Sequence, residues 1–379
     1  MASIEKRSGG YRVRYRDPLG KSRGRTFRRK ADAERFARET EVDKDRGTWV
    51  DPRGGDTPLA EWAETFMSLG RTLSPTTQQT YRRDLDRYVL PRFGTYRLGR
   101  IPPEEIEQWL NDELAAGLAA SSVHRHYRTL RRVLQTAVEK DRLLANPCDR
   151  VRPPKVAKRD MAVLTWDQAI ALAEAHGERF RAMIYLAVDS GMRWSELVGL
   201  RRKSVDVARR KVRVTEQLVQ LDDSSWVRRP PKTSAGVRSV TISGAVADML
   251  AEHLDQYVDD EGDALVFTNA AGNPLSHSSF LTHHFKPAQQ RAGVSCRFHD
   301  LRHTSVALAI AEGAHSKTIQ ARMGHSSITV TLDRYGHLFP ELDEALASAF
   351  DARLRTSRAS CVTDHRDGAK DDRATVPGR

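Results

Sequence analysis

The stretch His299-Asp300-Leu301-Arg302-His303-Thr304 carries a histidine and an arginine three positions apart. On a helix this spacing puts both side chains on one face, so that both can reach a single phosphate group. Three further segments hold polar side chains in a similar density. They are Ser190-Gly191-Met192-Arg193-Trp194-Ser195-Glu196-Leu197, Pro231-Lys232-Thr233-Ser234, and the run from Gly324-His325-Ser326-Ser327 to Asp333-Arg334-Tyr335-Gly336-His337.

Together these segments supply what phosphodiester transfer without a metal ion requires. Guanidinium groups stabilise the charge that develops on the phosphate oxygens, because they donate in pairs and stay protonated. A tyrosine can form a phosphoester that a second hydroxyl later displaces. Imidazoles and a lysine of lowered pKa can carry the protons. The six side chains in this set are Arg193, Lys232, His299, Arg302, His325 and Tyr335.

Taken singly, each of these residues has a plainer interpretation. Lys232 alone would be a solvated lysine in a turn, and Tyr335 alone a half-buried tyrosine of the core. The histidines would more often be satisfied polar groups at helix ends. The ordered set, however, makes a catalytic site the better prediction.

At this point the sequence resembles the tyrosine recombinase (phage integrase) family. GMRWSEL around Arg193 is similar to the family's first arginine motif, and HDLRHT to its second box. MGHSS, followed by Tyr335 ten residues after His325, resembles the third box. Met323 replaces a more usual leucine, which is an apolar exchange of similar volume. The resemblance covers about residues 57–350, and residues 1–50 resemble the family's arm-binding domain.

The resemblance implies a mechanism for these residues. Tyr335 would attack the scissile phosphate, leaving a 3′-phosphotyrosine link and a free 5′ hydroxyl. Arg193 and Arg302, helped by His325, would hold the non-bridging oxygens. Lys232 would protonate the leaving oxygen and His299 would accept the tyrosine proton. No metal, ATP or other cofactor is implied.

It also implies the class and the partners. We expect a site-specific integrase that moves a phage or other mobile element into and out of double-stranded DNA, binding core and arm sites. Two strand exchanges require four protomers, so a homotetramer on DNA is expected, and a host DNA-bending protein and an excision factor are possible partners. The helical stretch Glu341–Leu354 is expected to dock on a neighbouring protomer.

The expected fold is multidomain and mainly α, with small β elements. Residues 1–50 are predicted to form a three-stranded sheet plus helix that binds arm-type DNA. Residues 57–148 are predicted to be a four-helix domain that binds core-type DNA, and 160–355 an α+β catalytic domain. Within the catalytic domain the expected β segments are Lys211–Val219, about Trp226–Arg229 and Val237–Ile242. A flexible tail, 356–379, completes the chain.

Positive charge is concentrated at the N-terminus. Residues 1–30 hold eleven basic and two acidic side chains. Tyr11, Val13 and Tyr15 alternate with arginines, which indicates a strand with one packed and one charged face. A turn at 17–20, a strand over about 22–28 and a helix over about 30–46 should follow. The sheet's candidate DNA contacts are Arg12, Arg14, Arg16, Arg25 and Arg28.

A second basic surface is predicted on the last helix of the four-helix domain. Five basic side chains fall within nine positions, without an acid among them, opposite a stripe of apolar residues. An ordinary solvated helix face would explain a few of these charges, but the density favours contact with phosphates. The candidate DNA-binding residues here are Arg125, Arg128 and Arg132.

Composition is consistent with a DNA-binding protein of the cytoplasm. The formal net charge is +12 and the pI about 9.8, which favours polyanionic partners. The three cysteines are far apart and form no disulfide or metal motif. No apolar run approaches the ~18 residues of a membrane span, and we expect a cytoplasmic protein that joins the nucleoid on binding DNA.

Several alternatives remain open on the sequence. A Xer-like chromosome or plasmid resolvase would generally lack the basic N-terminal unit. A type IB topoisomerase would use the same chemistry without site dependence, and a DNA-binding regulator with a decayed site would form no covalent adduct. A metal-dependent nuclease would need a ligand set, for which the candidates are His277, His283, His284 and His303.

Overall fold

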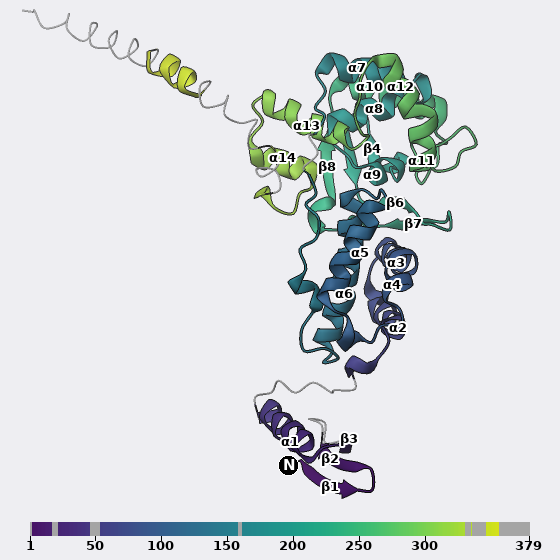
Figure 1. Cartoon of the computed structure of the whole chain (residues 1–379). Helices are drawn as coiled ribbons and strands as arrows, with labels where there is room; N and C mark the ends of the chain where they lie inside the picture. The colour runs from purple at the N-terminus through teal and green to yellow at the C-terminus, as the bar shows by residue number, and fades with distance from the viewer. Residues whose placement is uncertain are drawn as a thin grey trace, which may run out of the picture. The chain divides into compact units, whose positions relative to one another are not determined.

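The computed structural model describes residues 2–16, 22–45, 54–157, 161–329, 335 and 346–355 (Figure 1). The chain divides into two compact units, Met1–Lys158 and Arg159–Arg379. Helices dominate both units and the sheets are small, which confirms the predicted fold class. The predicted turn at 17–20 and the predicted tail 356–379 lie outside the described residues.

The first unit begins with an antiparallel sheet in the order β1 (Ser3–Arg7), β2 (Gly10–Arg16), β3 (Ser22–Phe27). Helix α1 (Lys30–Asp45) packs against it through a small core formed by Val13, Tyr15 and Ala33. This is the predicted three-stranded sheet plus helix. The alternation along β2 holds, because Val13 and Tyr15 are buried while Arg14 and Arg16 are exposed.

The rest of the first unit is helical. It consists of α2 (Leu59–Leu69), α3 (Pro75–Asp84), the short α4 (Leu90–Phe93), α5 (Pro103–Ala115) and α6 (Ala120–Glu139). A π-helical turn, Leu85–Val89, joins α3 to α4, so the predicted second helix comes in two pieces. The core of these helices is held by apolar packing and by Trp62, whose indole nitrogen donates to the Val133 carbonyl at 3.0 Å.

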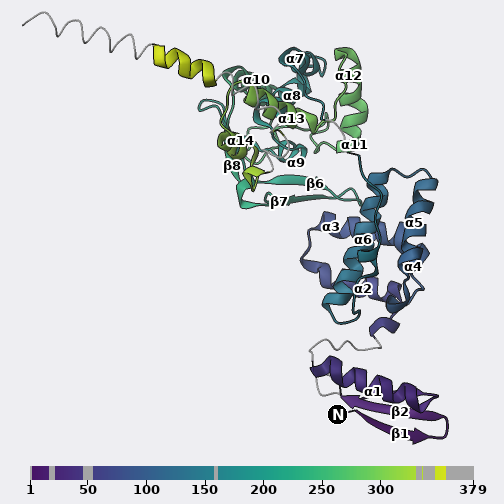
Figure 2. The same ribbon diagram turned by 60° about the vertical axis from the view of Figure 1, so that its left-hand side comes forward.

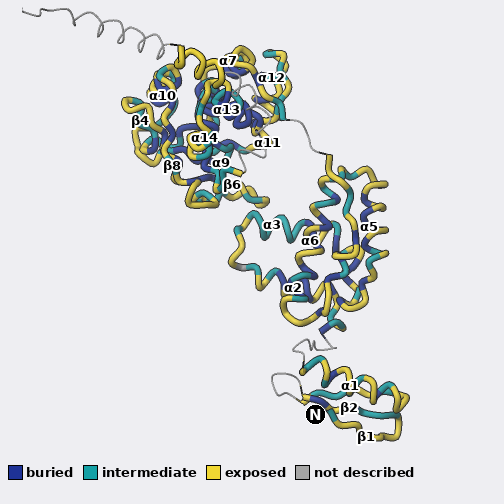
Figure 3. The backbone as a smooth tube through the Cα atoms, turned by 90° about the vertical axis from the view of Figure 1, so that its left-hand side faces the viewer, coloured by how far each residue is buried: buried dark blue, intermediate teal, exposed yellow. Residues whose placement is uncertain are grey.

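Two large apolar side chains of these helices are not buried. Leu69 of α2 and Leu114 of α5 are both exposed. Each lies in the last turn of its helix, where the chain leaves the helix before a partner can cover it. Along α6, by contrast, a buried stripe and an exposed flank alternate as predicted (Figure 3).

The second unit starts with α7 (Trp166–Glu174), which begins at the predicted capping box of Thr165 and Gln168. Helix α8 (Glu178–Ser190) contacts α7, α10 (Gly244–Tyr257) and α13 (Asp300–Ala311), and so forms the centre of the unit. The remaining helices are α9 (Trp194–Val198), α11 (His277–Phe280), α12 (Lys286–Ala292) and α14 (Ser316–Met323). Residues 346–355 are also helical.

The β segments of this unit form two separate sheets. Strands β4 (Val205–Asp206), β5 (Lys211–Val214) and β8 (Arg238–Thr241) make one antiparallel sheet, and β6 (Gln217–Gln220) pairs with β7 (Trp226–Arg229) in a hairpin (Figure 2). The single strand predicted over Lys211–Val219 was therefore wrong. The chain changes sheets at Thr215-Glu216, where the Glu216 carboxylate binds Arg201 at 2.5 Å.

Among the described residues, every helix is too short or too polar to cross a bilayer.

Candidate active site

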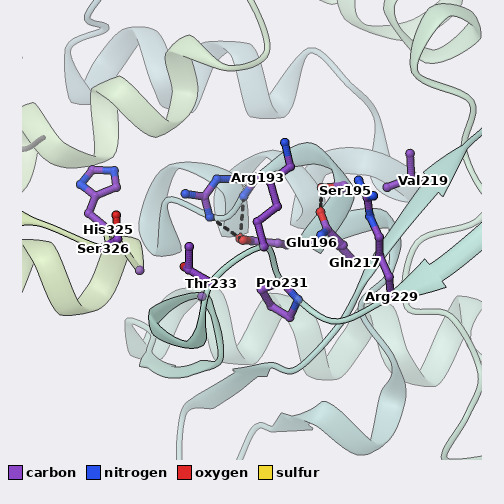
Figure 4. Close-up of a pocket in the computed structure, with 13 residues that line it drawn as sticks. Arg193, Ser195, Glu196, Gln217, Val219, Arg229, Pro231, Thr233, His325 and Ser326 are labelled. Atoms are coloured by element: carbon purple, nitrogen blue, oxygen red, sulfur yellow. Dashed lines mark hydrogen bonds and ion pairs between the residues drawn. The ribbon is translucent and has the colours of Figure 1, made fainter. Parts of the chain in front are cut away.

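A cleft of about 510 Å³ in the second unit gathers side chains from distant parts of the sequence (Figure 4). Arg193 reaches it from the start of α9, Lys232 from the segment after β7, and His325 from the end of α14. Three of the six predicted catalytic residues therefore line one cavity. The other lining side chains include Ser195, Gln217, Arg229, Thr233 and Ser326.

Arg193 is held by Glu196, one turn further along the chain. Its Nη1 donates to Glu196 Oε1 at 2.7 Å, and its backbone N–H donates to Oε2 at 2.9 Å. The Glu196 carboxylate is buried, which alone would raise its pKa. Its hydrogen bond to Arg238 and the charges of Arg238 and Arg193 outweigh burial and lower that pKa below the ordinary value. The carboxylate is thus ionised and orients the arginine.

Arg302 forms hydrogen bonds to two segments that lead into the cleft and so holds them together. Only 4% of it is exposed, and it donates to the Gly191 carbonyl from Nη1 at 2.5 Å and to the Met323 carbonyl from Nη2 at 2.7 Å. Gly191 lies two residues before Arg193, and Met323 two residues before His325. Burial, with the nearby Arg193 charge, lowers the pKa of Arg302 to about 9. It remains charged at neutral pH.

Gly191 is required at the end of α8 for two reasons. Its φ is +63°, which side-chain-bearing residues rarely adopt. A Cβ at this position would also lie 2.5 Å from the Met323 sulfur. The glycine therefore lets the Arg193 segment and the His325 segment approach each other closely.

Tyr335 lies outside the cleft lining. Only 2% of it is exposed, and its ring packs with Val306, Ile310, Ile319 and Met323. Its hydroxyl forms a short contact with Nδ1 of His303. Tyr335 shares its apolar cluster with Met323, whose carbonyl oxygen accepts a hydrogen bond from Arg302, so the nucleophile predicted from the sequence lies near one of the two predicted arginines.

The histidine at the Tyr335 hydroxyl in this structure is His303, whereas the sequence predicted His299. His299 is exposed and stands at the N-cap position of α13, and its ring meets the His303 ring edge-on at 4.9 Å between centroids. Sequence reasoning gave His303 no part in this site. The available signal was its place directly after Arg302, on a helix already predicted to be catalytic.

Arg238 is a second residue that sequence reasoning missed. Its Nη2 binds Glu196 Oε2 at 2.9 Å and its Nε donates to the Arg322 carbonyl at 2.7 Å. It therefore links the carboxylate that orients Arg193 to the end of α14, which precedes His325. One arginine on a short alternating strand gave no signal of this role.

The two faces of the N-terminal sheet separate its candidate DNA contacts. Cross-strand partners share a face, and Arg25 pairs with the buried Val13. Arg25 accordingly lies over the rings of Phe27 and Phe36, at 5.4 and 5.3 Å. Arg12, Arg14 and Arg16 belong to the opposite face, with small partners across β3; they are Thr26, Gly24 and Ser22. Arg28 follows β3 and is exposed.

The candidate arginines of α6 have acidic neighbours that the local sequence did not show. Arg125 binds the buried Asp84 of α3 at 3.2 Å, and Arg132 binds Glu139 at 3.0 Å. Arg128 is exposed, and the described residues show no ion pair for it. Partners brought in by the fold, or from further along the helix, thus neutralise part of the predicted basic surface.

The histidines considered as metal ligands lie in unrelated surroundings. His277 packs on Trp194 at 5.0 Å, His284 on Phe180 at 4.6 Å, and His303 contacts Tyr335. Within the described ranges, the structure contains no group of three or more His, Cys, Asp or Glu side chains placed to hold a metal ion.

Comparison with known proteins agrees with this geometry. The phage integrase family matches residues 162–341, and the N-terminal SAM-like domain of phage integrases matches 59–114. A prophage phiRv2 integrase of Mycobacterium tuberculosis is 30% identical over 352 residues, covering 90% of this chain and 92% of the relative. The integrase of Mycobacterium phage L5 is 28% identical, covering 93% and 97%.

Solved structures share the fold. The Tn1549 transposon integrase in complex with transposon right end DNA matches with a TM-score of 0.67 at 20% identity, over 78% of this chain and all of that one. A lambda integrase tetramer bound to a Holliday junction matches with a TM-score of 0.56 at 21% identity, over 86% and 96%. The chain belongs to the phage integrase family of tyrosine recombinases, enzymes that cut and rejoin DNA.

Proposed function

We propose that this recombinase integrates and excises a phage or other mobile element, using Tyr335 as the nucleophile. The observation that carries the proposal is the position of Arg302. It anchors the segments of Arg193 and His325 on one cleft, and Met323, which accepts its second hydrogen bond, belongs to the same apolar cluster as Tyr335. A phosphate in the cleft would meet the Arg193 guanidinium group, with Arg302 and Tyr335 behind the segments that line the cleft.

Each residue then has a defined task. Arg193 and Arg302, with His325, stabilise the negative charge on the non-bridging oxygens. The Tyr335 oxygen forms a bond to phosphorus, and the bond to the 5′ oxygen breaks. Lys232 supplies the proton that this leaving oxygen needs. The phosphotyrosine retains the energy of the broken bond, so rejoining needs neither ATP nor a metal ion.

The same proposal covers the domains and partners. Residues 1–50 bind arm-type DNA, 57–148 bind core-type DNA, 160–355 catalyse, and 356–379 form a tail. Recombination between two duplexes needs four nucleophiles and hence a homotetramer, assisted by a host DNA-bending protein and an excision factor. The protein acts in the cytoplasm, on the nucleoid, where its DNA substrate lies.

The helix at 346–355 supports assembly between protomers. Leu346, Phe350 and Leu354 follow one another at a spacing of four and are 51%, 61% and 64% exposed. This apolar face would be covered by docking on a neighbouring protomer. Normal assembly on DNA after deletion of residues 341–379 would remove this part of the proposal.

The basic N-terminal sheet favours an integrase over a Xer-like resolvase. The relatives that match 90% and 93% of this chain are themselves named integrases. A type IB topoisomerase activity would instead appear as relaxation of supercoiled plasmid without dependence on site sequence.

The direct test is a nicked suicide substrate that carries the element's core site. Cleavage next to the nick releases a short fragment, which traps the covalent adduct. We expect one labelled residue, Tyr335, and no adduct with Tyr335→Phe, which keeps the buried ring. An adduct at another residue, or none with the wild type, would refute the proposed function.

A further inference from the structure

We propose that His303, rather than His299, accepts the phenolic proton of Tyr335 when the tyrosine attacks DNA. This inference rests on the proposed function, because it presupposes that Tyr335 is the nucleophile. It assigns a catalytic role to a residue outside the six predicted from the sequence.

The contact between the two side chains carries the argument. Nδ1 of His303 meets the Tyr335 hydroxyl directly, and their ring centroids are 5.8 Å apart. A general base must lie within hydrogen-bond reach of the proton that it removes, and His303 satisfies this condition. His303 is 4% exposed and Tyr335 is 2% exposed, so bulk water does not compete for the proton.

The surroundings of His303 suit an imidazolium. Asp300, one turn earlier on α13, is 2% exposed and is held by Arg297 at 2.6 Å. Burial alone would raise the pKa of Asp300, but Arg297 and then His303 lower it below the ordinary value. The ionised carboxylate would in turn stabilise a proton on His303.

In the described part of the chain, the charged groups next to α13 include an ion pair and Arg302. On α8 and α14, which pack against α13, Asp189 and Arg322 bind each other at 2.6 Å. On α13 itself, Arg302 is turned to the Gly191 and Met323 carbonyls. His299 touches the edge of the His303 ring from an exposed position.

The step is balanced in atoms and charge. As the Tyr335 oxygen bonds to phosphorus, the phenolic proton passes to Nδ1 of His303, and the 5′ oxygen leaves with a proton from Lys232. In the rejoining step the incoming 5′ hydroxyl returns its proton to Lys232, and His303 returns its proton to the phenol. No oxidant, reductant or further reactant is needed.

The test compares His303→Asn with His299→Asn in the full chain. An asparagine at 303 can still accept the tyrosine hydrogen bond through its amide oxygen, but it cannot take the proton. We expect His303→Asn to slow single-turnover adduct formation on the suicide substrate by about 10²-fold or more. Affinity for the same DNA should stay unchanged. A rate for His303→Asn equal to that of the wild type would overturn the proposal.

A more acidic nucleophile separates proton transfer from positioning. With 3-fluorotyrosine at position 335, the phenol needs less help to ionise, so the defect of His303→Asn should shrink. A purely structural role predicts the same defect with either phenol, and that result would also refute the inference. If His303→Asn does not fold, His303→Gln is used in its place. A wild type without any adduct at Tyr335 would instead refute the proposed function.

Discussion

Burial changes what an arginine can do at this site. Arg302 gives two of its donor groups to main-chain carbonyls and has a pKa of about 9, lowered by burial and by the charge of Arg193. A bound phosphate would counter both effects and restore the full preference for the charged form. Part of the affinity for DNA would therefore come from reducing the repulsion between the guanidinium groups of Arg193 and Arg302.

Lys232 allows a sharp test at the residue scale. Its proposed task is to protonate the leaving 5′ oxygen, and an alanine cannot do this. We expect Lys232→Ala to slow cleavage by about 10²- to 10⁴-fold on an ordinary phosphate. A substrate with sulfur at the 5′ bridging position needs no such proton, so on it the variant should approach the wild-type rate. Rates are read from single-turnover adduct formation.

The matched control for this prediction is Lys203→Ala. Lys203 is exposed and binds Asp263 at 2.5 Å, away from the cleft. It should cleave both substrates like the wild type. A Lys232→Ala defect of equal size on both substrates would contradict the role as an acid.

The catalytic residues that stand in recognisable motifs could be predicted from the sequence. Residues whose role depends on contacts made by the fold could not. Arg193, Lys232 and His325 stand in motifs, and the structure brings them to one cleft. Arg238 stands in no motif, and His303 stands inside HDLRHT without a role that the motif assigned to it. Their roles come from distances between segments up to 126 positions apart in the chain, such as Glu196 to the end of α14, and only the fold sets those distances.

At the scale of elements, periodicity predicted the helices well and the strands less well. The helices were predictable because capping residues, such as Thr165, mark their starts and apolar stripes mark their buried faces. The run Lys211–Val219 contains no Gly or Pro that would mark its break. At the break Glu216 forms an ion pair with Arg201, which lies fifteen residues away and is invisible to a local pattern.

The end of α7 contributes a pH dependence to stability. His176 lies just after this helix, and burial lowers its pKa to about 4. An unfolded histidine titrates near 6.5, so the unfolded state binds the proton first as the pH falls. Between pH 6.5 and about 4 the folded state should therefore lose up to about 1.4 kcal/mol per pH unit through this group.

Substitution of His176 by phenylalanine tests this. The variant keeps an aromatic ring beside Phe280 and Phe285 and removes the titration. Its free energy of unfolding, from urea titrations across the window, should fall less steeply than that of the wild type. His283→Gln, a change at an exposed histidine, is the control and should keep the wild-type slope. Equal slopes for all three proteins would contradict the assignment.

For the whole molecule, the placement of charge separates two modes of DNA binding. The outer face of the N-terminal sheet presents Arg12, Arg14 and Arg16 beside small residues, while Arg25 is stacked on aromatic rings. The first face can approach a groove closely. On α6, Arg125 and Arg132 form ion pairs with acidic side chains. Among the described candidates on this helix, Arg128 is therefore the one whose charge is least neutralised.

Removal of residues 1–55 should abolish arm-site binding and integration yet preserve cleavage of the core site. The expectation follows from the separate small core of the N-terminal sheet. Gel shifts on arm and core fragments, with the suicide substrate as a parallel readout, provide the measurement. Unchanged arm-site binding would contradict it.

A triple change, Arg12→Gln with Arg14→Gln and Arg16→Gln, keeps the domain and removes the charges. Each lost phosphate contact should reduce the salt dependence of arm-site binding by a slope of about 0.9.

The anchor of Arg302 has an evolutionary consequence. Every amino acid has a backbone carbonyl oxygen, so the hydrogen bond from Arg302 to position 323 does not depend on the side chain at that position. Another apolar side chain at that position would therefore leave the hydrogen bond to Arg302 in place. Position 191 is more restricted, because its positive φ favours glycine and a Cβ there would press against the Met323 side chain. The two positions whose carbonyl groups bind Arg302 are thus expected to evolve under unequal constraint.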